Sequence, residues 1–175
     1  MKMKLLPYDT FEIQTSLTLE ETITALKAEV EPKRWLRWFS RDHALFEGDV
    51  SRDGFKIMRI INYRNSFLPV ISGTFKQSQN GINVMIRMGL HPFVMAFMCI
   101  WFGGVILGLF AVGFGLASSK MSLSFPLLIP PAMLIFGWVL VSGSFWFEAR
   151  KAKPQLLSIL HGQIKNEQIA RPDRE

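Results

Sequence analysis

The fold is decided by one uninterrupted apolar run, Phe93–Ala117, which reads FVMAFMCIWFGGVILGLFAVGFGLA. Its 25 residues include no charge and no proline. A helix rises about 1.5 Å per residue, so the run exceeds the roughly 30 Å hydrocarbon core of a bilayer and predicts a tilted membrane-spanning helix. A second uncharged run, Leu127–Phe147, reads LLIPPAMLIFGWVLVSGSFWF and predicts another. The alternative, a buried helix of a soluble protein, is disfavoured by two such runs in so short a chain.

Charged residues lie almost entirely outside these runs. The 175 residues carry a formal net charge of +6, from 20 Lys or Arg and 14 Asp or Glu. Lys120 is the one charged residue between positions 92 and 147. This partition predicts an α+β domain at 1–91, a two-helix transmembrane hairpin at 92–148, and a helix with a tail at 149–175. Because 49% of the residues are hydrophobic and 19% are charged, a disordered chain is excluded.

The basic residues beside the hairpin indicate its orientation. The segment 118–126 is short, so the two helices should be antiparallel, with both flanks on one side of the membrane. Lys120 lies between the helices, whereas Arg150, Lys151 and Lys153 follow the second run. Cytoplasmic flanks are enriched in Lys and Arg, so both soluble parts and both termini are expected in the cytoplasm.

Small residues recur at steps of four, three and four on one face of the first predicted membrane helix. They are Gly104, Gly108, Ala111 and Gly115. Such a face lets two helix backbones approach closely. The packing partner is either the chain's own second helix, which offers Gly137 and Ser144, or a helix of another subunit. Neither run contains Asp, Glu, Lys or Arg, so transport through a single copy is not expected.

The segment before the hairpin has the pattern of a helix followed by strands. Thr18 with Glu21 three residues later is a capping-box pattern, and apolar residues follow at helical spacing. Turn signals at Asp53-Gly54, Asn65-Ser66 and Asn80-Gly81 then separate alternating segments. Four antiparallel strands are expected, at 44–49, 55–63, 67–75 and 82–90, and a short strand is possible at 11–13.

The expected fold class is therefore α+β plus a membrane helical hairpin. The N-terminal helix should cover the apolar face of a roughly four-stranded antiparallel meander. After the two transmembrane helices, the C-terminal segment should form an amphipathic helix, with Pro154 in its first turn. Its apolar stripe would be Leu156, Leu157, Leu160 and Ile164.

A segment dense in cations and aromatic residues follows the predicted N-terminal helix. The candidates in it are Lys33, Arg34, Trp35, Arg37, Trp38 and Arg41. If the segment is helical, the tryptophans share a face flanked by cations, which is typical of contact with an anionic membrane surface. The alternative is that the aromatic residues pack under the sheet and the cations form a solvated rim. Nucleic-acid binding is not expected, because the cations are few.

The strands before the hairpin also carry a resemblance. The residues concerned are Phe46-Glu47-Gly48, Phe55–Ile61, Tyr63–Gly73 (YRNSFLPVISG) and His91-Pro92-Phe93. They resemble a group of small uncharacterised membrane proteins of cyanobacteria and other bacteria, which share a YRNSFLP-like segment before two membrane helices. The resemblance covers about residues 44–117. It implies an integral protein of a bacterial inner membrane, plasma or thylakoid, and carries no catalytic residues.

Within that segment, Tyr63, Arg64 and Asn65 form a candidate polar turn patch for recognition. The alternative is structural: Asn65 bonds its own turn backbone, and Arg59 and Arg64 hold the turn by its carbonyls.

The sequence contains no recognisable catalytic or cofactor pattern. No GxGxxG or Walker A motif stands in a loop, and His43, His91 and His161 lack metal-ligand spacing. The single cysteine, Cys99, lies in the first apolar run and is expected to face lipid or to pack. We expect no enzyme activity, no cofactor and no metal.

The function expected from these features is that of an accessory, scaffold or assembly component of the membrane. Its cytoplasmic domain would lie against the membrane and contact lipids, and the hairpin would bind a protein partner or a second copy. The alternative is a membrane effector or sensor, for example in stress or anti-phage defence, whose hairpin oligomerises to perturb the bilayer.

Overall fold

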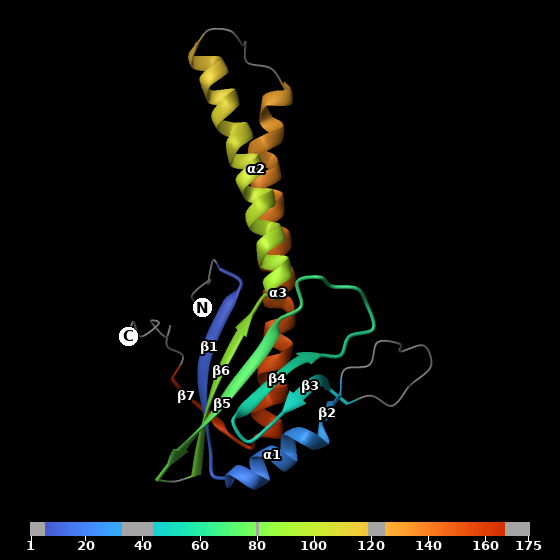
Figure 1. The fold of residues 1–175 in the computed structure, drawn as a ribbon, viewed down its shortest axis with the longest axis vertical. Coiled ribbons are helices and arrows are strands. Elements are labelled where there is room, and N and C mark those ends of the chain that lie inside the picture. The colour runs from blue at the N-terminus through green and yellow to red at the C-terminus, as the bar shows by residue number, and fades with distance from the viewer. Residues whose placement is uncertain (1–5, 33–43, 80, 119–124, 167–175) are drawn as a thin grey trace.

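Two long apolar helices rise from one end of a curved β-sheet (Figure 1). The computed structural model describes residues 6–32, 44–79, 81–118 and 125–166. In chain order the elements are β1 (Tyr8–Thr15), α1 (Leu19–Ala28), β2 (Val30–Glu31), β3 (Phe46–Val50), β4 (Gly54–Arg59), β5 (Val70–Ser78), β6 (Gly81–Gly89), α2 (Pro92–Ala117), the short helix η1 (Phe125–Leu128), α3 (Ile129–Ile159) and β7 (Gln163–Asn166). The predicted α+β class with two long apolar helices is confirmed.

The sheet is larger than predicted, with seven strands in the order β2-β3-β4-β5-β6-β1-β7. The expected meander is present as β3 to β6. Beyond it, β1 pairs antiparallel along the whole of β6, with Phe11 opposite Ile86. β7 pairs with β1, and the two-residue β2 runs parallel to β3. Because an unpaired edge leaves a row of unsatisfied N–H and C=O groups, β1 completes the sheet beside β6.

Two predicted turns are confirmed, and the third is a longer loop. Gly54 has a φ of +154°, and a Cβ there would lie 2.2 Å from the carbonyl oxygen of Gly73, so only glycine fits. Gly81 opens β6 with a φ of +120°. Between β4 and β5, however, residues 60–69 form a loop rather than the tight turn predicted at Asn65-Ser66.

Helix α1 begins as its capping box predicts. The Thr18 hydroxyl accepts from the Glu21 N–H, and the Thr18 N–H donates to the Glu21 carboxylate at 2.9 Å. Ile23 and Leu26 are buried and join the core. The position of α1 was predicted wrongly, because it lies at the end of the domain farthest from the hairpin (Figure 1).

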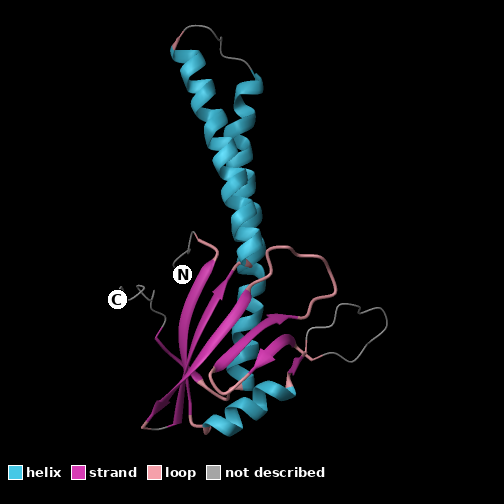
Figure 2. Ribbon diagram, viewed as in Figure 1, coloured by secondary structure: helices cyan, strands magenta, loops and turns pink. Residues whose placement is uncertain are grey.

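The helix that covers the apolar face of the sheet is α3. This helix is 31 residues long. Its first half belongs to the apolar hairpin, and its second half enters the domain, where the strands curve around it (Figure 2). Its buried apolar positions in the domain, at steps of four and three, are Phe145, Ala149, Ala152, Leu156 and Ile159. The prediction of a separate C-terminal helix within 149–175 is therefore wrong, because the helix there is the second half of α3.

Pro154 lies inside α3, where the sequence suggested the first turn of a new helix. An interior proline removes a backbone hydrogen bond and crowds the carbonyl four residues earlier, at a cost of about 3 kcal/mol. Leu156 and Leu160 just after it are fully buried, and burying each such side chain stabilises by about 1.5–3 kcal/mol. Packing against the sheet thus offsets the proline. Ile164, placed in the same predicted stripe, lies in β7 instead.

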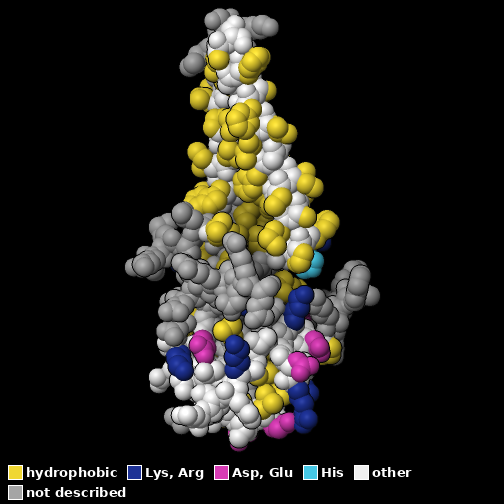
Figure 3. Space-filling model, turned by 60° about the vertical axis from the view of Figure 1, so that its left-hand side comes forward, with side chains coloured by type: hydrophobic (Ala, Val, Ile, Leu, Met, Phe, Trp, Pro, Cys, Tyr) yellow, Lys and Arg dark blue, Asp and Glu magenta, His cyan; other side chains and the backbone are white. Residues whose placement is uncertain are grey.

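The hairpin consists of α2, η1 and the first half of α3. Both helical segments are long and apolar enough to cross a membrane, with mean hydropathy of 2.3 and 1.9. Apolar side chains cover the hairpin, whereas charged side chains gather on the domain (Figure 3). Six of the buried or half-buried positions of α2 recur at steps of four and three, as in helices packed at a small angle. They are Met98, Phe102, Val105, Leu109, Val112 and Leu116.

The small-residue face of α2 does not make this contact. Nothing in the described part of the chain lies within 4 Å of a Cβ built at Gly104 or Gly108. The close approach comes from Gly137 of α3, whose Cβ position lies 3.2 Å from the Phe102 ring and 3.4 Å from the Trp101 indole nitrogen. The structure thus shows no close approach at Gly104 or Gly108 within one copy, and their packing against another helix stays a prediction.

Substitution of Gly137 by leucine should push the two helices apart, because the Phe102 ring occupies the space that the new side chain needs. The matched control is Gly143→Leu in the same helix, where nothing lies within 4 Å of the Cβ position. In thermal unfolding of the full chain in detergent, Gly137→Leu should cost about 1–3 kcal/mol, as overpacking does. Equal melting temperatures for the two variants would contradict the close approach.

Candidate functional site

The junction between sheet and hairpin is short on both of its chain connections. β6 ends at Gly89, and Leu90 and His91 are the residues before α2. His91 caps α2, because its Nδ1 accepts from the Phe93 N–H at 3.3 Å, and Pro92 fills the first helical turn. The second connection is α3 itself, which passes from hairpin to domain as continuous helix.

A charged cluster holds α3 at the level where its apolar run ends. Glu148 follows Phe147 directly and is fully buried. The Arg59 guanidinium, at the end of β4, donates to Glu148 Oε2, and the Tyr63 hydroxyl donates to Glu148 Oε1. Lys151 Nζ lies 3.6 Å from Glu148 Oε1. The Nε of Arg59 donates to Gln155 Oε1 at 3.0 Å, so Arg59 bridges two turns of α3.

A second ion pair links α3 to strand β1, which lies toward the other edge of the sheet. Asp9 of β1 is buried, and its Oδ2 lies 3.9 Å from Lys153 Nζ. The ammonium of Lys153 also lies 4.5 Å from the ring centroid of Phe11, within the range of cation–π attraction. Contacts from β1 and β4 thus fix α3 from two directions, which sets its rotation about its own axis.

The electrostatics of the cluster depend on the buried Glu148 carboxylate. A buried charge costs several kcal/mol of desolvation, and its partners must compensate. Because the Tyr63 hydroxyl donates to this carboxylate, the pKa of Tyr63 is raised above the usual tyrosine value. The guanidinium and the phenol both already bond the carboxylate, so the cluster is suited to holding α3 against the sheet.

The predicted polar turn patch does not act as one unit. The Tyr63 hydroxyl bonds to Glu148 although half of the side chain is exposed, and Arg64 is exposed as well. The side-chain oxygen of Asn65 accepts from the Phe67 N–H at 2.9 Å, so it fastens its own loop, as the structural alternative predicted. Arg59 was expected to bond carbonyls of the turn and bonds α3 instead.

The candidate membrane-surface residues cannot be placed. Lys33, Arg34, Trp35, Arg37, Trp38 and Arg41 all lie outside the described residues, as does Lys120. Their proposed contact with anionic lipid stays a prediction.

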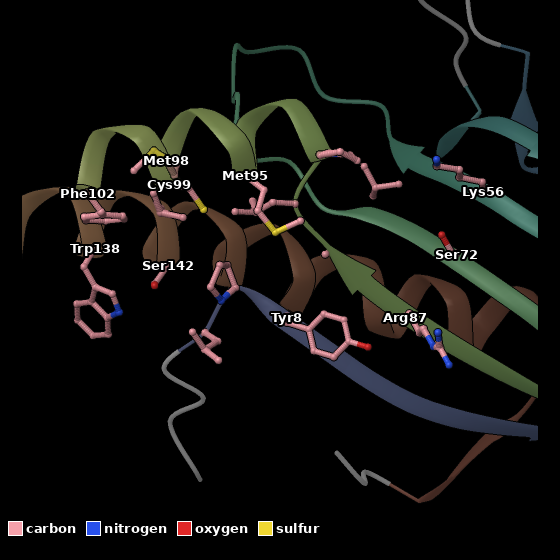
Figure 4. A pocket seen from close by; sticks show the side chains of 17 residues that line it. Tyr8, Lys56, Ser72, Arg87, Met95, Met98, Cys99, Phe102, Trp138 and Ser142 are labelled. Atoms are coloured by element: carbon pink, nitrogen blue, oxygen red, sulfur yellow. The ribbon is translucent and has the colours of Figure 1, made fainter. Parts of the chain in front are cut away.

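A groove of about 610 Å³ opens where the hairpin meets the face of the sheet that points away from α3 (Figure 4). One end is lined by apolar side chains of both hairpin helices, among them Met98, Phe102, Trp138 and Val141. Lys56, Ser72 and Arg87 line the other end, and no acidic residue lines the groove among those described. Sequence reasoning missed this site, because its residues come from six separate elements.

Comparisons with models of protein families, with curated proteins and with solved structures found no match for this chain. The resemblance to small bacterial membrane proteins therefore stays a prediction. Among the described residues, no group of three or more His, Cys, Asp or Glu is placed to hold a metal ion.

Replacing Arg59 by methionine should destabilise the protein by about 3–5 kcal/mol, because Glu148 would stay buried without the guanidinium. The control is Arg52→Met, which removes a surface pair with Glu20 whose side chains are 78% and 65% exposed. That pair is worth at most about 1 kcal/mol. Chemical unfolding in detergent measures both, and Arg59→Met/Glu148→Met should recover most of the loss. Equal effects of the two arginine changes would refute the fastening role.

The Tyr63 hydroxyl should ionise above the usual tyrosine pKa of about 10. Its bond to Glu148 therefore stabilises the folded state below that pH, and the contribution disappears as pH rises through the raised folded pKa. The chain has two tyrosines, so phenolate absorbance in Tyr8→Phe protein reports on Tyr63 alone. Adding Glu148→Gln should lower this pKa. An identical titration curve with and without the Glu148 carboxylate would show that the bond is absent.

Proposed function

We propose that this chain is an integral membrane protein that acts as an accessory, scaffold or assembly component and presents its α+β domain in a fixed orientation at the cytoplasmic face. The observation that carries the proposal is the continuity of α3, which is apolar hairpin helix in its first half and domain core in its second. The Glu148 cluster fastens the domain at the change-over. A domain held in this way cannot rotate freely, which suits a component that positions a partner at the membrane.

Membrane insertion is supported by how little of the apolar helices is covered. In the most apolar windows of the two helices, 11% and 17% of residues are buried. A core helix of a soluble protein is mostly buried, and exposed apolar patches of this size mark membrane or protein contacts. The cations that follow the hairpin favour a cytoplasmic position for both termini.

The partners of this proposal are membrane lipids and either another protein or a second copy, reached through the hairpin. The second candidate function, an effector whose hairpin oligomerises and perturbs the bilayer, is favoured by one observation. The face with Gly104 and Gly108 has open space in front of it within one copy. Small-residue faces of this kind support close helix contact between subunits.

Purification of the full chain from its native membrane in mild detergent, followed by mass spectrometry, tests the proposal. We expect a stoichiometric protein partner, together with cytoplasmic activity of a reporter fused after Glu175. Four glycines inserted between Phe147 and Glu148 should release the partner, because they uncouple domain from hairpin. The same insertion between α2 and α3 is the control and should retain it. Retention by both variants would contradict fixed presentation.

Two glycine substitutions separate the accessory role from the effector role. Gly108→Leu fills the small-residue face, and Gly103→Leu adds the same side chain elsewhere on α2, also in open space. An effector would form homo-oligomers and leak dye from vesicles, and Gly108→Leu alone would abolish both. A chain that stays monomeric and leaves vesicles sealed favours the accessory role.

A further inference from the structure

We infer that the groove between sheet and hairpin binds an anionic lipid, with its phosphate at Lys56, Ser72 and Arg87 and its acyl chain along α2 and α3. The inference relies on the membrane placement of the hairpin proposed above, and goes beyond it by assigning a ligand and a site.

The polar end of the groove is built by strand register. Lys56 of β4 is opposite Ser72 of β5, and Ser72 is opposite Arg87 of β6. Neighbouring strands are about 4.8 Å apart, so the two cations are about 10 Å apart at the backbone with the serine hydroxyl between them. Long cationic side chains at this spacing can both reach one phosphate. The Lys56 amine points toward the hairpin helices (Figure 4).

The charge of this end is complementary to an anion. Both cations are exposed, and neither forms an ion pair with a described residue. Asp49 is opposite Lys56 on β3, but it lies on the side away from Ser72 and does not line the groove. Lys56 and Arg87 therefore make this end of the groove positive, and its lining within the described part of the chain contains no carboxylate.

The other end of the groove lies along the apolar helices. Its lining extends along α2 from Pro92 to Phe102, eleven residues that span about 15 Å of helix. Met95, Met98 and Phe102 from α2 lie beside Trp138 from α3 in this wall (Figure 4). If the hairpin spans the bilayer, this wall is at the depth of acyl chains, whereas the sheet lies outside. A cationic end above an apolar end matches a membrane lipid and not a free anion.

The test uses the full chain in nanodiscs of phosphatidylcholine that contain a trace of phosphatidylglycerol with a photoreactive acyl chain. Cross-links should map to Met95–Phe102 and to Trp138–Ser142. Unlabelled phosphatidylglycerol should compete with the label, and phosphatidylcholine should not. Inorganic phosphate should not compete either; if it does, the site is an anion site and the lipid assignment fails.

Two pairs of variants make the test specific. Lys56→Gln/Arg87→Gln should weaken competition by phosphatidylglycerol about 30-fold, the value of two basic residues near an anionic surface. Arg52→Gln/Lys76→Gln removes the same charge from exposed positions off the groove and should change nothing. Cys99→Trp should fill the apolar end and abolish cross-linking there, whereas Ala96→Trp, on the same helix but outside the lining, should not.

The remaining outcomes also decide the question. An equal loss of competition in the two double variants would overturn the inference, since the loss would then come from the lower net charge of the protein and not from the groove. Selective labelling that arises only after deletion of residues 2–5 would assign the groove to the chain's own N-terminus. Correct membrane topology without lipid selectivity refutes the groove inference alone, whereas a hairpin that does not insert refutes the proposed function as well.

Discussion

A carboxylate that is fully buried must be matched by donors, and this constraint at Glu148 organises the molecule. Arg59 at the end of β4 and Tyr63 in the loop after it both donate to the carboxylate. Removing either contact leaves a charge in a medium of low dielectric constant, so the sheet and the helix hold one relative position. Because Glu148 directly follows the apolar run, that position is defined where the chain leaves the proposed bilayer.

The same junction explains why the groove exists. α3 occupies one face of the sheet, while α2 leaves the end of β6 after two residues. The hairpin rises from the end of the sheet, and on the face opposite α3 a hollow remains between the apolar side chains of the hairpin and the row from Lys56 to Arg87. The ion pairs of Arg59 and Lys153 hold α3 against the sheet, and only Leu90 and His91 separate α2 from β6.

Local patterns in the sequence predicted the local structure well. The capping box at Thr18, the turn at Gly54 and the two apolar runs all appear as expected, because each depends on neighbours in the chain. What failed depends on partners far away in sequence. The β1–β6 pairing joins residues some seventy positions apart, and the packing that offsets Pro154 comes from a sheet completed much earlier in the chain. The groove is of the same kind, since no single segment contains it.

The packing of α3 on the face of the sheet also constrains the order in which the protein can fold during synthesis. Strands β1 to β6 leave the ribosome before the hairpin, yet the helix that covers their apolar face is encoded after it. Until α3 emerges, the side chains of Ile57, Ile71 and Ile86 lack the helix that covers most of their face of the sheet. If the hairpin enters the membrane as it is synthesised, insertion comes first and the domain closes last. In that order, a chain whose domain is folded is a chain whose hairpin is already in the membrane.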